Sequence, residues 1–473
     1  MDAQELPGDD TATRSVCSTR SPADGEQGLV QRDPPAATGP AYAGEESLTM
    51  TRVLLLAYGC EPNRGSEAGI GWHWASQLSR EHDVFLITHP RGRRGIQREL
   101  AANPRLRLRI RYVDLPAPVD PWRMIPGELL IQPRYILWQF AAYRAARKIV
   151  EREEIDLVHH VSWTTMTGPT LGWALGPPFV WGPVGSGQQA PLQMRRFLGG
   201  KGWLRELVRN QQVRFVGLNP LAVMAARRSE VAIASNPDTL VKLRELGADP
   251  VVLQPDAAVN TSWLASGPRP ARYPERPIIL WSSRMMARKA PGLAIEAFAR
   301  LRQVRDAELW ILGDGPLMHD CRKLAVELGV QADVRFWGWQ PHDVVPGLLN
   351  EADIFLFTSL RDTCPMPVLE AMATGLSVVA LDLHGIRYLP DEAVLKVPVG
   401  DPDDLVGDVA AGLLQLADLP QERAERGKAA WECIRDGHLW THRYEGVQEV
   451  YASILGEAPG QNDWDEAGGR AAD

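Results

Sequence analysis

Short apolar runs that alternate with helical patterns limit the fold of this chain more than any other feature of its sequence. Residues 53–58 are continuously apolar, which is typical of a strand buried on both faces of a parallel sheet. A helical pattern through Trp74 and Leu78 follows, and then a second apolar run at 84–88. Further strands are expected at 156–161, 179–181 and 230–234. Strands that alternate with helices predict an α/β fold with parallel sheets.

A stretch rich in Gly and Pro divides this pattern into two series. Residues 266–274 show no apolar periodicity and are expected to be a linker. A second series of strands is expected at 278–281, 307–312, 334–336, 354–357 and 377–380. At 473 residues the chain is too long for one ordinary core. We therefore predict the following parts: a disordered segment 1–49, a Rossmann-like domain 50–265, a second Rossmann-like domain 276–435, a helix 436–456 and a disordered tail 457–473.

Two carboxylates lie eight positions apart in the stretch 361–375. Asp362 follows the apolar strand 354–357, and Glu370 is expected to open a helix that ends at Gly375. A carboxylate in the first turn of a helix lies beside free backbone N–H groups and the positive end of the helix dipole. These N–H groups can bind phosphate, and the carboxylates can accept hydrogen bonds from sugar hydroxyls. The arrangement suits a phosphorylated ligand with many hydroxyl groups.

This stretch resembles the E-x7-E motif of the retaining glycosyltransferases of family 4, also called glycosyltransferase group 1. Other segments resemble that family in the same order along the chain, from about 51 to about 455. They contain Gly65, Ser66 and Gly69 in the place of a Gly-Gly loop, Arg284 and Lys289 after a strand, and Gly313 in the next turn. The resemblance implies the GT-B fold. Its two Rossmann-like domains, for acceptor and donor, face each other across a cleft, and the C-terminal helix crosses back to the first domain.

The resemblance also implies roles for these residues. Arg284 and Lys289 would neutralise the departing diphosphate, a task that suits a planar guanidinium fork and a mobile ammonium group. Glu370 would hold the ribose, and Asp362 would hold the donor sugar. The family usually has Glu at position 362, so the shorter Asp departs from its pattern. Without the resemblance, these residues would read as solvated charges, a helix cap and a turn Asp.

Backbone donors and the N-terminal glycines complete the candidate site. Pro365 and Pro367 have no N–H, so contacts with the donor are expected from the intervening residues Thr363, Cys364, Met366 and Val368. The loop with Gly65, Ser66 and Gly69 would approach phosphate and acceptor, because glycine lets the backbone come close. His160 is a weaker candidate, since the histidine that the family places nearby is absent. A histidine packed at a strand end is the alternative.

Several cofactor patterns are formally present but carry little weight. Residues 185–190 read G-x-G-x-x-A, yet Pro191 follows where a helix should continue, so we expect a cleft-facing loop that can contact the acceptor. Asp401 and Asp403 form a D-x-D, but they precede a helix that Asp403 or Asp404 is expected to cap. We therefore predict no cofactor and no metal. The formal net charge of -8 gives no reason to expect nucleic acid.

The sequence thus predicts a retaining glycosyltransferase that moves a sugar from a nucleotide-sugar to a glycan, a glycolipid or a small natural product. A sugar phosphorylase, a nucleotide-dependent oxidoreductase and a non-catalytic nucleotide-sugar-binding protein are the alternatives. The five cysteines are widely spaced without a C-x-x-C, and no apolar run approaches 18 residues. These features predict a cytoplasmic protein. The basic amphipathic stretch 134–148 leaves peripheral membrane contact open, although packing inside the protein is favoured.

Overall fold

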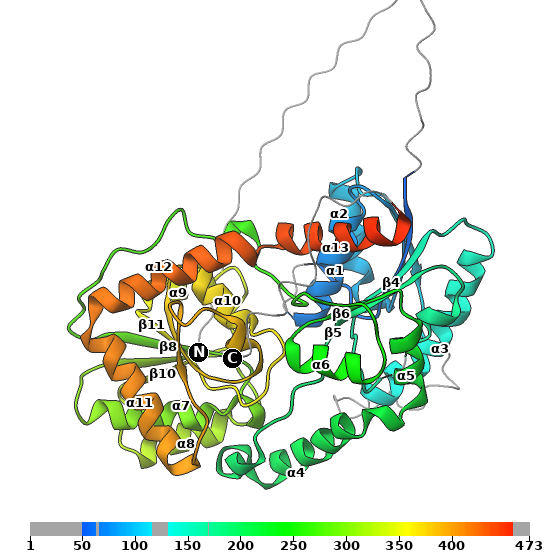
Figure 1. Ribbon diagram of the computed structural model, residues 1–473. Helices are drawn as coiled ribbons and strands as arrows, with labels where there is room; N and C mark the ends of the chain where they lie inside the picture. Colours follow the sequence, from blue (N-terminus) through cyan, green and yellow to red (C-terminus); the bar gives the residue numbers. More distant parts are fainter. Residues whose placement is uncertain (1–49, 63–65, 116–130, 169, 457–473) are drawn as a thin grey trace, which may run out of the picture. The chain divides into compact units, whose positions relative to one another are not determined.

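Two parallel β-sheets organise the computed structural model, which describes residues 50–62, 66–115, 131–168 and 170–456 (Figure 1). The first sheet has the strand order β3-β2-β1-β4-β5-β6-β7. Its strands, in chain order, are β1 (Arg52–Ala57), β2 (Asp83–Thr88), β3 (Leu108–Tyr112), β4 (Leu157–Ser162), β5 (Phe179–Val184), β6 (Val231–Ala234) and β7 (Val251–Leu253). The predicted parallel α/β architecture is confirmed for this part of the chain.

The second sheet has the order β10-β9-β8-β11-β12-β13 and is also parallel. Its strands are β8 (Ile278–Ser282), β9 (Glu308–Leu312), β10 (Val334–Gly338), β11 (Ile354–Phe357), β12 (Ser377–Leu381) and β13 (Val394–Val397). The strand order reverses between β8 and β11. Ligands of such sheets bind outside the carboxyl ends of the strands at this switch point. Arg284 and Lys289 follow β8, and Asp362 follows β11, so the candidate residues lie where the topology expects a ligand.

Helices connect the strands, and many begin with Pro in the first turn, where its missing N–H costs nothing. Asn236 caps α6, because its side chain accepts a hydrogen bond from the amide of Thr239. The helices are α1 (Ser66–Leu78), α2 (Arg93–Ala102), α3 (Ile131–Val150), α4 (Arg195–Arg214), α5 (Pro220–Arg228), α6 (Pro237–Glu245), α7 (Pro291–Arg302), α8 (Met318–Glu327), α9 (Val345–Glu351), α10 (Met366–Ala373), α11 (Pro402–Asp418), α12 (Pro420–Gly437) and α13 (Trp440–Leu455).

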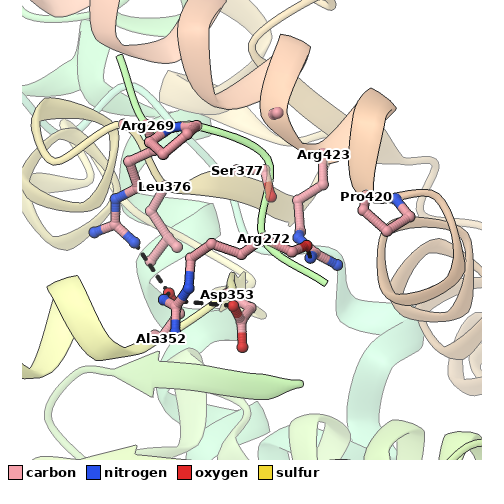
Figure 2. A pocket seen from close by; sticks show the side chains of 11 residues that line it. Arg269, Arg272, Ala352, Asp353, Leu376, Ser377, Pro420 and Arg423 are labelled. Carbon is pink, nitrogen blue, oxygen red and sulfur yellow. Dashed lines mark hydrogen bonds and ion pairs between the residues drawn. The ribbon is translucent and has the colours of Figure 1, made fainter. Parts of the chain in front are cut away.

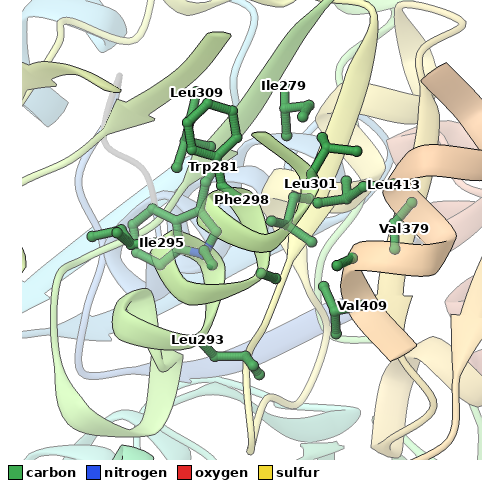
Figure 3. Packing of buried hydrophobic residues seen from close by; sticks show 14 of the residues in the cluster. Ile279, Trp281, Leu293, Ile295, Phe298, Leu301, Leu309, Val379, Val409 and Leu413 are labelled. Atoms are coloured by element: carbon green, nitrogen blue, oxygen red, sulfur yellow. The ribbon is translucent and has the colours of Figure 1, made fainter. Parts of the chain in front are cut away.

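The second sheet packs on a large apolar core beneath the strand ends (Figure 3). Trp281 from β8 and Phe298 from α7 are among its largest fully buried side chains. Trp281 also donates a hydrogen bond from its indole N–H to the hydroxyl of Thr358, at 2.9 Å. This contact ties the core to the loop that follows β11.

The last helix, α13, returns to the first sheet, as the sequence predicted (Figure 1). Val447, Val450 and Tyr451 are buried in the same apolar cluster as the β1 residues Val53 and Leu55. The hydroxyl of Tyr451 lies 2.7 Å from Nδ1 of His159 in β4. Helix α13, the last described element, therefore packs against the first sheet, which contains β1.

Some expectations lie outside the described residues or were incomplete. The segments 1–49 and 457–473 are not described, and the proposed domain limits stay a prediction. Three edge or near-edge strands, β3, β7 and β13, were missed because each is short and partly exposed. In α3, Tyr135 and Trp138 are buried while Ile136 and Phe140 remain 38% and 41% exposed. Among the described residues, no helix is long and apolar enough to cross a membrane.

Candidate functional site

Asp362 and Lys289 form an ion pair where the neighbouring strands β8 and β11 end. The carboxylate of Asp362 binds the ammonium group of Lys289 and lies 3.9 Å from a guanidinium nitrogen of Arg288. Burial alone would raise the pKa of Asp362, but the charges of Lys289 and Arg288 outweigh it and hold this pKa below its usual value. Burial lowers the pKa of Lys289, and Asp362 opposes that shift. Two predicted residues are thus in contact, and Arg288 joins them as a residue that sequence reasoning missed.

The loop with Lys289 is held by Thr358, the residue that directly follows β11. The hydroxyl of Thr358 donates to the carbonyl oxygen of Lys289 at 3.0 Å. Ala290 has φ 46°, in the left-handed region, and lies between Lys289 and the first residue of α7, Pro291. The backbone turn therefore fixes the direction from which the Lys289 side chain reaches Asp362.

Gly313 supports the segment with Arg284. It has φ 121°, and a methyl group on its Cα would lie 2.0 Å from the carbonyl oxygen of Ser283. The amide of Ser283 donates to Leu312, and the amide of Met285 donates to Asp314. Glycine is therefore required for the turn after β9 to pack against the segment 283–285. Arg284 has an exposed side chain.

Glu370 does not open its helix, contrary to the sequence-based expectation. Helix α10 begins at Met366 with Pro367 in its first turn, a position for which proline is well suited, so Glu370 lies in the second turn. Its carboxylate lies 3.2 Å from Nε2 of His342, and this hydrogen bond raises the pKa of His342. The ring of Trp263 packs on His342 with centroids 4.5 Å apart. His342 is a second residue that no sequence pattern indicated.

Three of the four expected backbone donors already have partners inside the protein. The amide of Thr363 donates to the Asp362 carboxylate at 3.2 Å. The amides of Met366 and Val368 donate to the carbonyl oxygens of Cys364 and Pro365, at 2.9 and 2.8 Å. Burial raises the pKa of the Cys364 thiol, and its Sγ contacts the carbonyl oxygen of Ala257. The thiol is therefore kept protonated.

A pocket that is partly open to solvent is lined by residues from both parts of the chain. Gly69 and His73 from α1 line it together with His342, Met366 and Glu370. The ring of His73 stacks on Trp440, with centroids 4.6 Å apart, and burial lowers its pKa to about 4. The pocket therefore joins a candidate from the N-terminal glycine segment to the second carboxylate of the motif.

A second pocket lies away from these residues (Figure 2). Arg269, Arg272 and Arg423 surround it together with Asp353. The guanidinium of Arg269 donates to the carbonyl oxygens of Leu349, Ala352 and Thr374. These contacts anchor the linker on the second sheet, and the predicted site residues are not among those that line this pocket.

The remaining predicted residues are placed differently from the expectation. Gly65 lies outside the described residues, while Ser66 starts α1, so residues 66–71 are helical rather than a loop. A methyl group at Gly71 would lie 1.9 Å from the carbonyl oxygen of Gly59, which shows how closely α1 approaches the end of β1. His160 is buried within β4, 3.3 Å from the hydroxyl of Tyr135, and burial lowers its pKa to about 4. It is a packed strand histidine.

Asp401, rather than Asp403 or Asp404, caps α11, because its carboxylate accepts from the amide of Asp403 at 2.9 Å. Among the described residues, no group of three or more His, Cys, Asp or Glu side chains is placed to hold a metal ion. The D-x-D therefore has a structural explanation.

Two further carboxyl groups were missed by sequence reasoning. Glu67, in the first turn of α1, accepts from the amide of Trp163 at 3.1 Å, and burial raises its pKa. Burial also raises the pKa of Asp256 to about 8, and the neighbouring Glu67 adds to this effect. Periodicity gives no signal for such groups, since their burial depends on contacts between distant segments.

We expect the contribution of Asp256 to wild-type stability to fall as the pH rises from about 4 to about 8. Asp256 keeps its proton in the folded protein up to about pH 8 but loses it near pH 4 when unfolded. The folded state thus binds more protons in this window, and one such group lowers the free energy of unfolding by up to about 1.4 kcal/mol per pH unit. Urea unfolding at several pH values should show that Asp256→Asn gains stability relative to wild type as the pH rises through this window. An unchanged slope, equal to that of the exposed control Asp404→Asn, would contradict this.

Comparison with known proteins agrees with this geometry. Residues 276–415 match the family model described as glycosyl transferases group 1. The chain is 35% identical over 187 residues to the lipopolysaccharide core biosynthesis glycosyltransferase LpsE of Rhizobium meliloti. The aligned region covers 39% of this chain and 51% of LpsE. It is 25% identical over 415 residues to the 2-deoxystreptamine N-acetyl-D-glucosaminyltransferase of Streptomyces fradiae, covering 81% of this chain and 90% of that protein. The chain spans only about half of LpsE and 40% of the alpha-D-kanosaminyltransferase of Streptomyces kanamyceticus.

Solved structures share the fold at low sequence identity. Anabaena Alr3699/HepE in complex with UDP gives a TM-score of 0.57 at 14% identity, covering 85% of this chain and 100% of that one. WaaG, a glycosyltransferase involved in lipopolysaccharide biosynthesis, gives 0.56 at 15% identity, with 84% and 99% covered. The predicted GT-B architecture is confirmed by these likenesses, which concern the fold alone.

Proposed function

We propose that this chain, whose residues 276–415 match the group 1 glycosyltransferases, moves a sugar from a nucleotide-sugar donor to a hydroxyl acceptor with retention of anomeric configuration. The observation that carries this proposal is the ion pair between Lys289 and Asp362 at the switch point of the second sheet. Cations and a carboxylate meet there at the ends of adjacent strands, as a phosphorylated sugar requires.

The cations act on the leaving group. When the bond between the anomeric carbon and the phosphate oxygen breaks, negative charge develops on the diphosphate. Lys289 and Arg284 bind this charge, and Arg288 adds a third cation on the same loop. Preorganised charges of this kind cost no reorganisation during the reaction. The acceptor oxygen forms the new bond on the same face, and its proton passes to the leaving phosphate.

The carboxylates hold the donor. Asp362 accepts from hydroxyls of the sugar, and Glu370, with His342 beside it, accepts from the ribose. Glu370 and Gly69 line the same pocket, which supports a donor bound between the two sheets, with the acceptor approaching from the α1 side. UDP is the first donor nucleotide to try, because a structural neighbour was solved as a UDP complex.

A transfer assay tests this proposal. The purified chain is incubated with nucleotide-sugars and a panel of glycan, glycolipid and aminocyclitol acceptors, and the released nucleoside diphosphate and the product are measured. We expect nucleoside diphosphate release that depends on the acceptor, and a product whose anomeric signals by NMR match those of the donor sugar. Turnover with inorganic phosphate as the acceptor would instead indicate a phosphorylase. Binding without turnover across the panel would indicate a non-catalytic protein.

A further inference from the structure

Helix α4 belongs in sequence to the first sheet but packs on the second. It lies between β5 and β6 along the chain, yet Met194 and Leu198 at its start are buried in the core of the second sheet. A methyl group on Gly202 would lie 2.7 Å from the Cβ of Ala287, in the turn before Lys289. In Figure 1 the helix runs along the bottom of the view, and it contacts the turn 287–289 that follows β8. The helix is thus in a position to link one part to the motif of the other.

Glu206 of α4 binds Arg361, the residue before Asp362. Its carboxylate accepts two hydrogen bonds from the guanidinium of Arg361, from Nε at 2.6 Å and from Nη2 at 3.1 Å. The side chains are only 4% and 15% exposed, so water screens this pair little. Arg288 adds a hydrogen bond to the carbonyl oxygen of Arg361 at 2.9 Å. Arg361 is therefore held through both its side chain and its backbone.

Arg209 lies one turn further along α4 and supports the residue after Asp362. Its guanidinium donates to the carbonyl oxygens of Ser186 and Gln188, at 3.1 and 2.8 Å. The amide group of Gln188, which is 1% exposed, in turn donates to the hydroxyl of Thr363 at 2.6 Å. The predicted cleft-facing loop 185–190 thus contacts the donor motif directly.

We propose that Glu206 and Arg209 are positioning residues that hold Asp362 in place for the donor sugar. Glu206 acts through Arg361, the residue before Asp362. Arg209 acts through Gln188, which binds Thr363, the residue after Asp362. This inference rests on the proposed function for its reference to the sugar. Asp is one methylene shorter than the Glu that is usual at this position, so its carboxylate reaches the sugar only if the backbone of 361–363 stays in place. The contacts of Glu206 and Arg209 in α4 hold the backbone of 361–363 in place.

The test compares Glu206→Gln with the matched control Arg196→Gln. Arg196 also lies on α4 and pairs with Glu296 and Asp403 of the second part, but it contacts neither Arg361 nor Gln188. The conservative variant Glu206→Asp keeps the charge. Amide hydrogen exchange is measured for residues 361–364, together with the affinity for the nucleoside diphosphate and with kcat and KM for the nucleotide-sugar.

In Glu206→Gln we expect exchange at 361–364 to quicken at least tenfold, because local opening no longer breaks the charged pair. We expect kcat/KM to fall roughly 10²-fold, as for a misplacement of about 1 Å, while nucleoside diphosphate affinity changes less than threefold. Glu206→Asp should recover part of the loss, and Arg196→Gln should match wild type. Arg209→Gln should give the same pattern by the second route.

Unchanged exchange at 361–364 in Glu206→Gln would overturn the claim that the Glu206–Arg361 pair holds this segment in place. Faster exchange with unaltered kcat/KM would overturn its link to the donor sugar. A parallel loss of nucleoside diphosphate affinity would show a general collapse of the site rather than positioning, and would also count against the proposal. If wild type binds no nucleoside diphosphate, the proposed function fails, and the exchange measurement alone decides whether α4 braces the loop.

Discussion

Lys289→Met is expected to abolish most of the sugar transfer and to destabilise the fold at the same time. The side chain of Lys289 is 8% exposed, so its removal leaves the Asp362 carboxylate, which is 20% exposed, without its nearest cation. Breaking one partner of a buried pair costs about 3–5 kcal/mol of folding free energy. Loss of a preorganised charge at the leaving group lowers kcat by roughly 10²–10³-fold. Urea unfolding and steady-state kinetics measure the two effects separately.

A double variant separates stability from function at this pair. Lys289→Met combined with Asp362→Leu removes both charges, and replacing a buried pair by apolar side chains is often neutral for stability. We expect the fold to recover while transfer stays lost. The exposed control Lys323→Met, whose partner is Glu327, should change stability by no more than about 0.5 kcal/mol. Recovery of transfer in the double variant would contradict the assigned roles.

Trp281→Ala is expected to cost about 3–5 kcal/mol of folding free energy. Trp281 is 1% exposed at the centre of the core shown in Figure 3, so its removal leaves a large cavity. The variant also loses the hydrogen bond to Thr358, whose hydroxyl supports the carbonyl of Lys289. Ligand affinity should fall together with stability, because the loop that carries Lys289 loses its support. Chemical unfolding with and without nucleoside diphosphate measures both.

Two control variants show whether the loss of stability in Trp281→Ala comes from the cavity. Trp281→Phe keeps most of the buried area and should lose mainly the hydrogen bond, at about 1 kcal/mol. Trp339 is 70% exposed, so Trp339→Ala should stay within about 0.5 kcal/mol of wild-type stability. A loss in Trp281→Phe as large as that in Trp281→Ala would mean that the hydrogen bond, rather than the cavity, dominates.

The elements that the sequence predicted well are those that are buried on both faces. Strands β1 and β8 are continuous apolar runs because helices cover both sides of a parallel sheet. By contrast, β3 alternates exposed and half-buried residues at the sheet edge, where an arginine costs little, so its run is broken. The start of α10 was misplaced because Pro367 was treated only as a missing donor, although proline also marks the first turn of a helix.

The candidate site likewise contains residues that the sequence indicated and contacts that it did not. Asp362 and Glu370 were proposed from their spacing after a strand, and Lys289 from the family resemblance. The topology brings Asp362 and Lys289 into contact because β8 and β11 are neighbours. Glu206 and Arg361 are separated by 155 positions, and no local pattern connects them. The raised pKa of Asp256 likewise arises from burial among distant segments. Contacts made by tertiary packing leave little trace in periodicity.

The most direct test of the central claim, a nucleotide-sugar site at Glu370 and Lys289, is a thermal-shift panel. UDP, GDP, ADP, CDP, dTDP and their sugar conjugates, with NAD for the oxidoreductase alternative, are added to wild type, Arg284→Ala, Glu370→Ala and the exposed control Glu392→Ala. A ligand at 100 times its Kd stabilises by about 2.7 kcal/mol. We predict a shift with one diphosphate nucleotide in wild type and Glu392→Ala that is lost in the other two variants. No shift with any nucleotide, or a shift that survives both substitutions, would contradict the claim.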